Sequence, residues 1–463
     1  MILLLGCTAP PVLTATLSET DPHAAVLTLD GAGTVDCSAL DDVHRLAVDG
    51  SAVARGLLAN ARYNCVATVD GRESDPVFVD TPRLPGDLPI GRVVKEADPA
   101  DVGFHLVNIA RENSQEVAAK KGLSTEMYLA VYDAEGQVRW HYSGVGGSDT
   151  DATWLGDSVL FGGFGGFVSV DPTEIDLDGN VLMTSVDTAD STWNTAGEWS
   201  HDAGISEDGE SIWAIELENV PDPDHPKEDW ESFTLERLDR ATGETNWAWS
   251  AYDDGVAGGW LEAGRAADRE PYHPNALWDE GDRIFVSLHN ENAILAIDTT
   301  TRDVVWRLGE DGDFTLLDVN GEPSDDWFYG QHDVKVIGDH VILYDNGLFG
   351  RETTRALVLT IDETARTAQI ETSWWGDGWY TPVWGGVDPR DDGTYDVTIG
   401  VVWWINPGVD DRSALSWIEP DGAGSAEELW RIEFPDRENG IYRSDHIGGC
   451  DAFDLVAYCP ELQ

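Results

Sequence analysis

The chain is poor in positive charge. Only 28 of its 463 residues are lysine or arginine, five of them lysine, against 87 aspartates and glutamates, and the formal net charge is −59. A surface this negative repels phosphate backbones, so nucleic acid is not expected as a partner. The acidic residues are spread along the whole chain and do not gather in a tail, which indicates a folded protein with a solvated acidic surface suited to a salty medium.

Long apolar runs and several catalytic motifs are also missing. No apolar stretch approaches the length of a membrane helix, so any attachment to a membrane would be through a lipid. The sequence has no Gly-x-x-x-x-Gly-Lys loop, which argues against a nucleotide as a group donor. It also has neither a Gly-x-Ser-x-Gly elbow nor a His-Glu-x-x-His motif. No cofactor is expected.

Cysteine is scarce, and its five positions divide into two pairs and one single residue. Cys37 and Cys65 lie in the N-terminal region, whereas Cys450 and Cys459 lie near the C-terminal end. Two local pairs are typical of disulfides formed in an oxidising compartment. We therefore expect an exported protein.

The single cysteine ends the segment Leu4-Leu5-Gly6-Cys7, which resembles the lipobox of bacterial lipoproteins, whose cysteine is lipidated. The six residues before Cys7 are too few for a complete signal peptide. Either the true start lies upstream or the match is chance, and we favour the first because the other segments fit an exported protein. Residues 1–7 are thus interpreted as part of a lipoprotein signal. This predicts a periplasmic or cell-surface lipoprotein that contacts the membrane through its lipid anchor only.

Residues 8–82 are predicted to form a small immunoglobulin-like or fibronectin-like β-sandwich. They contain short β-type runs with turn signals, and Tyr63 stands two residues before Cys65, as in a tyrosine corner. A Cys37–Cys65 bridge would stabilise a core this small. Residues 83–98 are interpreted as a linker, because prolines crowd its beginning and cannot hold a central strand.

A repeated unit fills residues 99–463. A hydrophobic run enters an acidic turn and emerges in a second run that often carries tryptophan. The six copies are Tyr132–Trp140, Ile175–Val181, Leu238–Trp247, Ile297–Trp306, Ile361–Trp374 and Ile418–Trp430. Each copy has room for a four-stranded blade of roughly 40–50 residues. The repeat therefore predicts an all-β chain with a six-bladed β-propeller behind the β-sandwich.

Three histidines head one shared pattern. After each of His201, His273 and His332 an apolar residue stands four positions on, followed by an acidic or glycine-containing turn and a β-type run. Equivalent positions of a repeated unit come together when the units are arranged around an axis. We therefore expect the three imidazoles to face a common channel, although a single histidine on a strand is more often a core residue.

The segments around these histidines resemble the bacterial arylsulfate sulfotransferases. The matching segments are His201-Asp202, His273-Pro-Asn-Ala-Leu277, Ser287-Leu-His289, Ile297-Asp298, Val305–Gly309, Gln331-His-Asp-Val334, Tyr344-Asp-Asn-Gly347 and Tyr442-Arg443. The resemblance covers most of the chain from about residue 100 to 450. It implies an exported enzyme that moves a sulfuryl group from an aryl sulfate to a phenol without a nucleotide donor.

The resemblance also implies roles for single residues. His332 would be the nucleophile and form a sulfohistidine in a ping-pong cycle, whereas His201 and His273 would bind sulfate oxygens or assist the phenolic leaving group. Imidazole suits both tasks because its charge depends on its protonation. Asp333 would either orient a nearby imidazole or face into the fold. Further contacts to the substrate are expected from Asn275, His289, Asn346 and Arg443.

One position departs from the family. Its Ser-x-Arg element supplies an arginine to the sulfate, and here His289 stands in that place. Histidine is shorter, is charged only when protonated, and cannot form a bidentate clamp. Either another base substitutes, with Arg443 as a candidate, or the substrate differs.

Two other functions remain open from the sequence. Three histidines are a sufficient set of zinc ligands, so a metal-dependent hydrolase is one alternative. The other is a non-catalytic binding propeller at the cell surface whose site has degenerated.

Overall fold

The computed structural model describes residues 10–86, 88–111, 127–145, 149–164, 169–186, 198–221, 229–262, 270–348, 350–351, 353–376, 378–400, 412–434 and 439–462. Cys7 and the lipobox-like segment lie outside them. Over the described residues the chain is all-β, as predicted, and its helices are α1 (Pro99–Val102), the π-helix η1 (Ala251–Val256) and the 3₁₀ helix η2 (Pro460–Leu462). None of these short helices has the length or the apolar character to cross a membrane.

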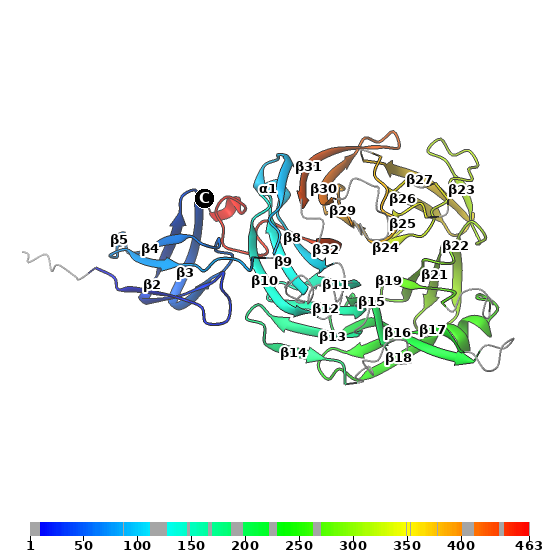
Figure 1. Ribbon diagram of the computed structural model, residues 1–463, viewed down its shortest axis with the longest axis horizontal. Helices are drawn as coiled ribbons and strands as arrows, with labels where there is room; N and C mark the ends of the chain where they lie inside the picture. The colour runs from blue at the N-terminus through cyan, green and yellow to red at the C-terminus, as the bar shows by residue number, and fades with distance from the viewer. Residues whose placement is uncertain are drawn as a thin grey trace, which may run out of the picture.

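The N-terminal strands form one sheet (Figure 1, blue). Its members are β1 (Leu13–Leu17), β2 (Ala25–Ala39), β3 (Asp42–Ala54), β4 (Arg62–Val69), β5 (Arg72–Glu73) and β6 (Val77–Asp80). The long strand β2 pairs with β1 and β3 over its first half, and with β3 and β4 over its second half. Cys37 of β2 lies opposite Cys65 of β4, and the two form a disulfide. A second disulfide joins Cys450 to Cys459.

A buried charge network joins this sheet to the rest of the chain. Arg139 is only 2% exposed, and its guanidinium lies 2.6 Å from Asp42 and 2.6 Å from Asp133. The Tyr63 hydroxyl donates to Asp42 and accepts the backbone N–H of Leu58 at 2.8 Å. The C-terminal segment also contacts this sheet, since the Val456 N–H donates to the backbone of β3. Figure 1 shows the red C-terminal segment beside the blue strands.

The strands after residue 91 form six further sheets in the described part of the chain. The strands of each sheet are given in hydrogen-bonded order. The first sheet has β10 (Val138–Val145), β9 (Met127–Asp133), β8 (Phe104–Arg111) and β32 (Asn439–Ile447), and the second has β11 (Asp149–Trp154), β12 (Ser158–Phe164), β13 (Ser169–Asp176) and β14 (Val181–Thr184). The third has β15 (Glu198–Ile205), β16 (Ser211–Pro221), β17 (Asp229–Asp239) and β18 (Thr245–Ser250), and the fourth has β19 (Pro274–Asp279), β20 (Arg283–Leu288), β21 (Ala293–Asp298) and β22 (Val304–Gly309). The fifth has β23 (Thr315–Leu317), β27 (Thr367–Trp374), β26 (Arg355–Asp362), β25 (His340–Asp345) and β24 (His332–Ile337), and the sixth has β28 (Gly386–Pro389), β29 (Tyr395–Ile399), β30 (Ser413–Pro420), β31 (Ala426–Phe434) and β7 (Arg92–Lys95). Strand β7 falls within residues 83–98, the expected linker, where the proline-free run Arg92–Lys95 can pair with β31.

These six sheets stand in a propeller-like ring. One edge strand of each sheet (β11, β15, β19, β24, β28 and β32) faces the middle, and each of these central strands contacts the next one around the circle. The circle closes because β32 contacts β11 and pairs with β8, the first strand of its own sheet. Figure 1 shows the resulting arrangement, with β15, β19 and β24 side by side near the centre.

The sequence repeat corresponds to the turn between the third and fourth strands of each sheet, counted from the middle of the ring. In the fourth copy, Asp298 Oδ1 accepts the backbone N–H groups of Thr300 at 2.9 Å and Thr301 at 2.7 Å. Equivalent bonds are made by Asp133, Asp176, Asp239, Asp362 and Asp421. An aspartate is needed there because its short carboxylate reaches the backbone of its own turn.

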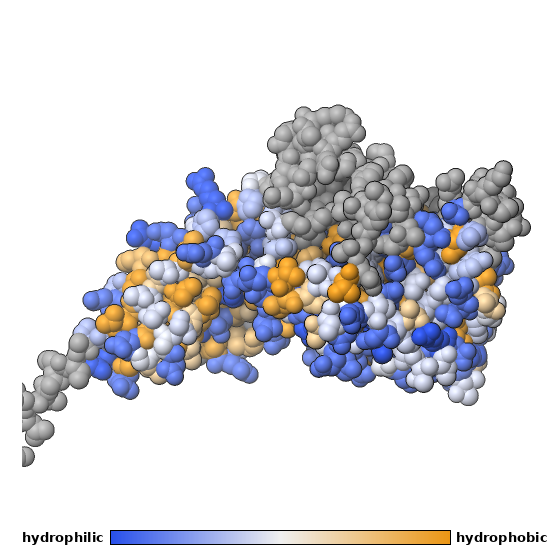
Figure 2. Space-filling model, turned by 90° about the horizontal axis from the view of Figure 1, so that it is seen from below, coloured by the Kyte–Doolittle hydropathy of each residue, from blue (hydrophilic) through white to orange (hydrophobic). Residues whose placement is uncertain are grey.

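The remaining acidic residues are consistent with a hydrated exterior. Figure 2 shows hydrophilic side chains over much of the coloured surface, with apolar ones in small groups between them. The exposed apolar residues include Val26, Val53 and Phe78 of the N-terminal sheet. Scattered apolar residues of this kind are normal on a folded surface.

Arg139→Met should destabilise the protein strongly. The change leaves the carboxylates of Asp42 and Asp133 buried without their cation, a situation that costs about 3–5 kcal/mol in the free energy of unfolding. Urea unfolding followed by tryptophan fluorescence measures the change. Arg45→Met is the control, because the side chains of the Arg45–Asp36 pair are 38% and 44% exposed and the pair should contribute far less. Equal effects of the two substitutions would contradict a stabilising role for the buried network.

Candidate functional site

The three histidines of the shared pattern lie at the same place in three consecutive sheets. His201 lies in β15, His273 directly precedes β19, and His332 begins β24. The pairing register shifts at each of these places. His201 and His273 have left-handed backbone, with φ of 52° and 48°. Residues with a Cβ rarely adopt this conformation, and a β-bulge redirects side chains. The sequence pattern therefore marks a repeated bulge of the central strands.

Four imidazoles form a continuous row at these bulges. The ring centroids of His201 and His273 are 4.6 Å apart, those of His273 and His289 are 5.0 Å apart, and those of His289 and His332 are 5.2 Å apart. We call these four residues the imidazole row. His289 joins it from the turn after β20, so the structure brings together all four histidines that the sequence singled out.

The protonation of His332 is determined by Asn346. The amide Nδ2 of Asn346 donates to the carbonyl oxygens of Thr381 at 2.7 Å and Trp384 at 2.9 Å, so its Oδ1 is left to accept. That oxygen lies 2.9 Å from His332 Nδ1, which must therefore carry the proton. The lone pair is on Nε2, which faces the backbone N–H of Trp384 at 3.3 Å.

His332 is also kept uncharged. It is 2% exposed, and burial lowers the pKa of its imidazole well below the usual range, with His289 and Arg443 adding to the effect. A neutral imidazole with its lone pair on Nε2 is the form that attacks an electrophile.

His289 is held in the same tautomer. Its Nδ1 lies 2.7 Å from Oδ1 of Asn290, whose Nδ2 donates to the backbone oxygen of Glu270 at 2.8 Å. The proton is thus on Nδ1, and Nε2 is buried with no hydrogen-bond partner among the described residues. Burial, followed by the charge of His273, lowers the pKa of His289 to about 4. At neutral pH this side chain is therefore a base and supplies no positive charge.

Arg443 lies close to the site but is enclosed by carboxylates. Its Nη1 is 3.0 Å from Asp151 and 3.1 Å from Asp202, and its Nε is 3.8 Å from Asp333. Its Nη2 donates to the backbone oxygen of Asn275. The guanidinium is 2% exposed, so its charge is already compensated inside the protein.

Two further predicted residues hold strands together. Asn275 Nδ2 donates to the backbone oxygen of Gln331 at 2.7 Å, which joins β19 to the start of β24. Asp333 accepts the N–H of Val387 at 2.8 Å and lies 2.6 Å from the Lys335 ammonium. Asp333 therefore faces β28, the next central strand.

Sequence reasoning missed a set of aspartates that join neighbouring central strands. Asp202 accepts the N–H of Leu277 at 2.8 Å, and Asp445 accepts the N–H of Trp154 at 2.7 Å, in the manner of Asp333. Burial, with Asp151 nearby, raises the pKa of Asp202 and of Asp445 to about 7. The signal was present, because Asp202 and Asp333 each follow a histidine of the shared pattern.

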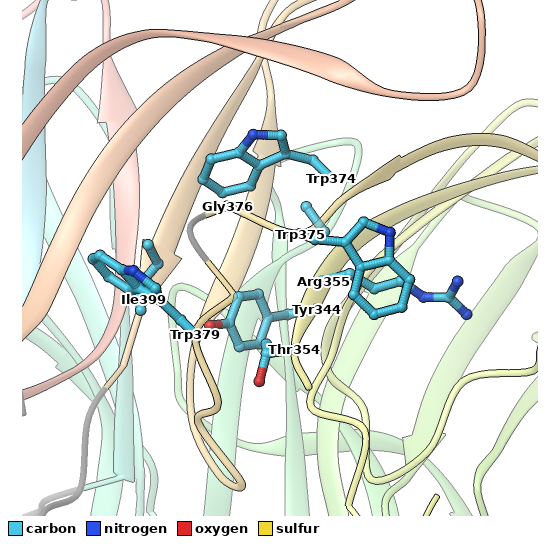
Figure 3. Close-up of a pocket in the computed structure, with 9 residues that line it drawn as sticks. Tyr344, Thr354, Arg355, Trp374, Trp375, Gly376, Trp379 and Ile399 are labelled. Atoms are coloured by element: carbon cyan, nitrogen blue, oxygen red, sulfur yellow. The ribbon is translucent and has the colours of Figure 1, made fainter. Parts of the chain in front are cut away.

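A shallow pocket of about 10 Å³, room for about one water molecule, lies between the sheets of β24 and β28. Its lining is mainly aromatic: Tyr344, Trp374, Trp375 and Trp379, with Thr354, Arg355, Ala356, Gly376 and Ile399. Figure 3 shows Trp375 and Trp379 on either side of the Tyr344 ring, with the Arg355 guanidinium pointing away. Tyr344 pairs with His332 across β24 and β25, and its hydroxyl lies 2.8 Å from Thr381 Oγ1. Tyr344 therefore connects the pocket to the site, since it pairs with His332 and stands two positions before Asn346, the hydrogen-bond partner of His332.

The described residues contain no group of three or more His, Cys, Asp or Glu side chains arranged to hold a metal ion.

Comparison with known proteins gave one family match. A profile of the family described as Arylsulfotransferase (ASST) matches residues 92–422, which include the whole imidazole row and end before Arg443. A comparison with curated proteins found no match. Similar solved structures include a protein of unknown function from Bacteroides caccae (11% identity, TM-score 0.43, 74% of this chain and 99% of that chain), TolB from Acinetobacter baumannii (11%, 0.40, 85% and 80%) and the periplasmic gluconolactonase of Pseudomonas aeruginosa (11%, 0.37, 88% and 98%).

At neutral pH, ¹⁵N NMR of the histidine side chains should show His332 protonated on Nδ1 and unprotonated on Nε2. Asn346→Leu removes the nearer acceptor of Nδ1 and leaves only the Gly330 backbone oxygen at 3.3 Å, so the fraction protonated on Nε2 should rise. Asn320→Leu, in an exposed turn, is the matched control and should leave the His332 signals unchanged. A protonated Nε2 in the unaltered protein would refute the tautomer derived from Asn346.

Proposed function

The chain belongs to the arylsulfotransferase family, and we propose that it moves a sulfuryl group from an aryl sulfate to a phenolic acceptor through an intermediate on His332. No nucleotide donor is involved. In this proposal the six sheets are the blades of a six-bladed β-propeller, and the N-terminal sheet folds over on itself along the long strand β2 into an immunoglobulin-like or fibronectin-like sandwich in front of it. The observation that carries the proposal is the neutral His332, whose lone pair is held on Nε2 by Asn346.

The first half of the reaction loads His332. Its Nε2 attacks the sulfur of the aryl sulfate, so an N–S bond forms while the S–O bond to the phenol breaks and the phenolate leaves with that electron pair. A proton from His273 neutralises the phenolate, because burial lowers the pKa of His201 well below its usual range and leaves that ring an uncharged partner for the sulfuryl oxygens. His273 lies in the same row as His332, and proton transfer from a positioned imidazole is ordinary general acid catalysis.

The second half unloads His332. The oxygen of an acceptor phenol attacks the sulfur, the N–S bond breaks, and the lone pair returns to Nε2. The proton of the phenol returns to the imidazole that gave one up. His289 lies beside His273, so its unshared pair on Nε2 can accept the phenol proton first and pass it on to His273.

Charge on the sulfuryl oxygens needs donors that are fixed before the reaction. The backbone N–H of Trp384 points at His332 Nε2 from 3.3 Å, which places it within reach of a sulfuryl group on that atom. Arg443 is ion-paired with Asp151 and Asp202, and it therefore does not replace the family arginine in this proposal. The natural donor is thus expected to be bound less tightly than by a guanidinium clamp.

We also propose that the protein is exported and anchored through Cys7. Two disulfides support an oxidising compartment, because such bonds are rare in the cytoplasm.

Mass spectrometry of the protein after mixing with 4-nitrophenyl sulfate tests the transfer. We expect one sulfuryl adduct on His332, accompanied by release of 4-nitrophenol and discharged by added phenol. His332→Ala should abolish both adduct and release. His340→Ala is the control, because His340 is a surface residue paired with Asp339 and Glu371.

Absence of both adduct and phenol release from the unaltered protein would contradict the proposal. It would favour the binding propeller or an enzyme for another substrate, with His289 in the place of the family arginine as the physical reason.

A further inference from the structure

The four imidazoles of the row differ in what holds their Nδ1 atoms. The Nδ1 of His201 lies 2.5 Å from the Ser200 hydroxyl, and those of His289 and His332 lie against amide oxygens at 2.7 and 2.9 Å. These three partners are neutral. The Nδ1 of His273 instead contacts the carboxylate of Glu270. A carboxylate beside an imidazole favours its protonated, positively charged form.

The carboxylate of Glu270 is itself hydrogen-bonded to Glu231 of β17. Two carboxyl groups in contact cannot both be ionised without a large cost, so they share one proton. Burial, followed by the charge of Glu270, raises the pKa of Glu231 to about 8. Burial also acts to raise the pKa of Glu270, but His273, Glu231 and His289 together outweigh it, and the pKa of Glu270 ends below its ordinary value. The shared proton therefore resides on Glu231.

The greater exposure of His273 also favours its protonated form. Its side chain is 27% exposed, whereas His332 is 2% exposed. A charge costs less where water still reaches it. Glu270 is also held in place through its backbone, since its carbonyl oxygen accepts from Asn290.

We propose that Glu270 and Glu231 are positioning residues that hold His273 as an imidazolium, which makes it the cation for the sulfuryl oxygens of a monoanionic aryl sulfate. This proposal rests on the proposed transfer reaction. It explains how the site binds a sulfate without the family arginine. The positive charge is on His273, next to His289, whereas the neutral nucleophile His332 lies on the other side of His289. The His273 imidazolium also supplies the proton that the departing phenolate takes up, and it regains one from the acceptor phenol.

The groups facing His273 set the expected pH dependence. They are His201, His289, His332 and Glu270, with Glu231 behind Glu270 and Glu198 close to Glu231. The imidazolium is lost as pH rises through the pKa of His273, so transfer falls on the alkaline side. Glu270→Gln removes the negative charge, so this fall should move to lower pH by about one unit or more.

Side-chain NMR titration of histidine-labelled protein is the deciding experiment. The signal that disappears in His273→Gln identifies His273. We expect it to titrate above the ordinary histidine value of about 6.5 and to move down by about one unit or more in Glu270→Gln. Glu231→Gln keeps a donor to Glu270 and should leave the titration near that of the unaltered protein. Glu244→Gln, on an exposed turn, is the control.

A His273 signal that titrates at or below 6.5, or that ignores Glu270→Gln, would overturn the proposal. If Glu270→Gln does not fold, Glu270→Asp draws the charge back from the ring and should produce a smaller shift in the same direction. The NMR titration does not depend on turnover. If the pKa of His273 depends on Glu270 but the protein has no transferase activity, the transfer reaction is refuted and the role of Glu270 stands. In an active protein, Glu270→Gln should lower kcat/KM about tenfold above the pKa of His273 and recover at lower pH.

Discussion

The site depends on one backbone feature, the bulge at the beginning of the central strands. His201, His273 and Asp333 all have left-handed backbone there, although none is glycine. Such conformations persist only where the surrounding structure enforces them. Here the closed ring of central strands does so: Asp202 joins β15 to β19, Asp333 joins β24 to β28, and the buried Arg443 joins β32 to β15 and β19 across the ring.

Much of the architecture could be predicted from the sequence, because two of its patterns have local physical causes. The acidic turn recurs since an aspartate must bind the N–H groups of its own turn, and its six copies correspond to the six sheets of the ring. The histidine pattern recurs since it marks the bulge. Equivalent positions in a ring then meet, which is why His201, His273 and His332 lie in one row.

The rest of the site depends on tertiary contacts that spacing does not reveal. Arg443 is a plausible sulfate ligand in sequence, and only the packed structure shows Asp151 and Asp202 around it. Glu231 and Glu270 are far apart in the chain and carry no motif, so nothing in the sequence connects them to His273. The amide partners of His289 and His332 likewise decide which nitrogen carries the proton. Charge and nucleophilicity are thus divided among chemically identical side chains by their neighbours alone.

Rapid-quench kinetics of 4-nitrophenyl sulfate without any acceptor phenol is the most direct measurement of the central claim, that His332 carries the sulfuryl group between donor and acceptor. The account predicts a burst of one 4-nitrophenol per active chain, followed by a slow phase that added phenol accelerates. It also predicts that the burst is absent from His332→Gln and intact in His340→Gln. Release without a burst, or a full burst from His332→Gln, would show that the group is transferred in another way.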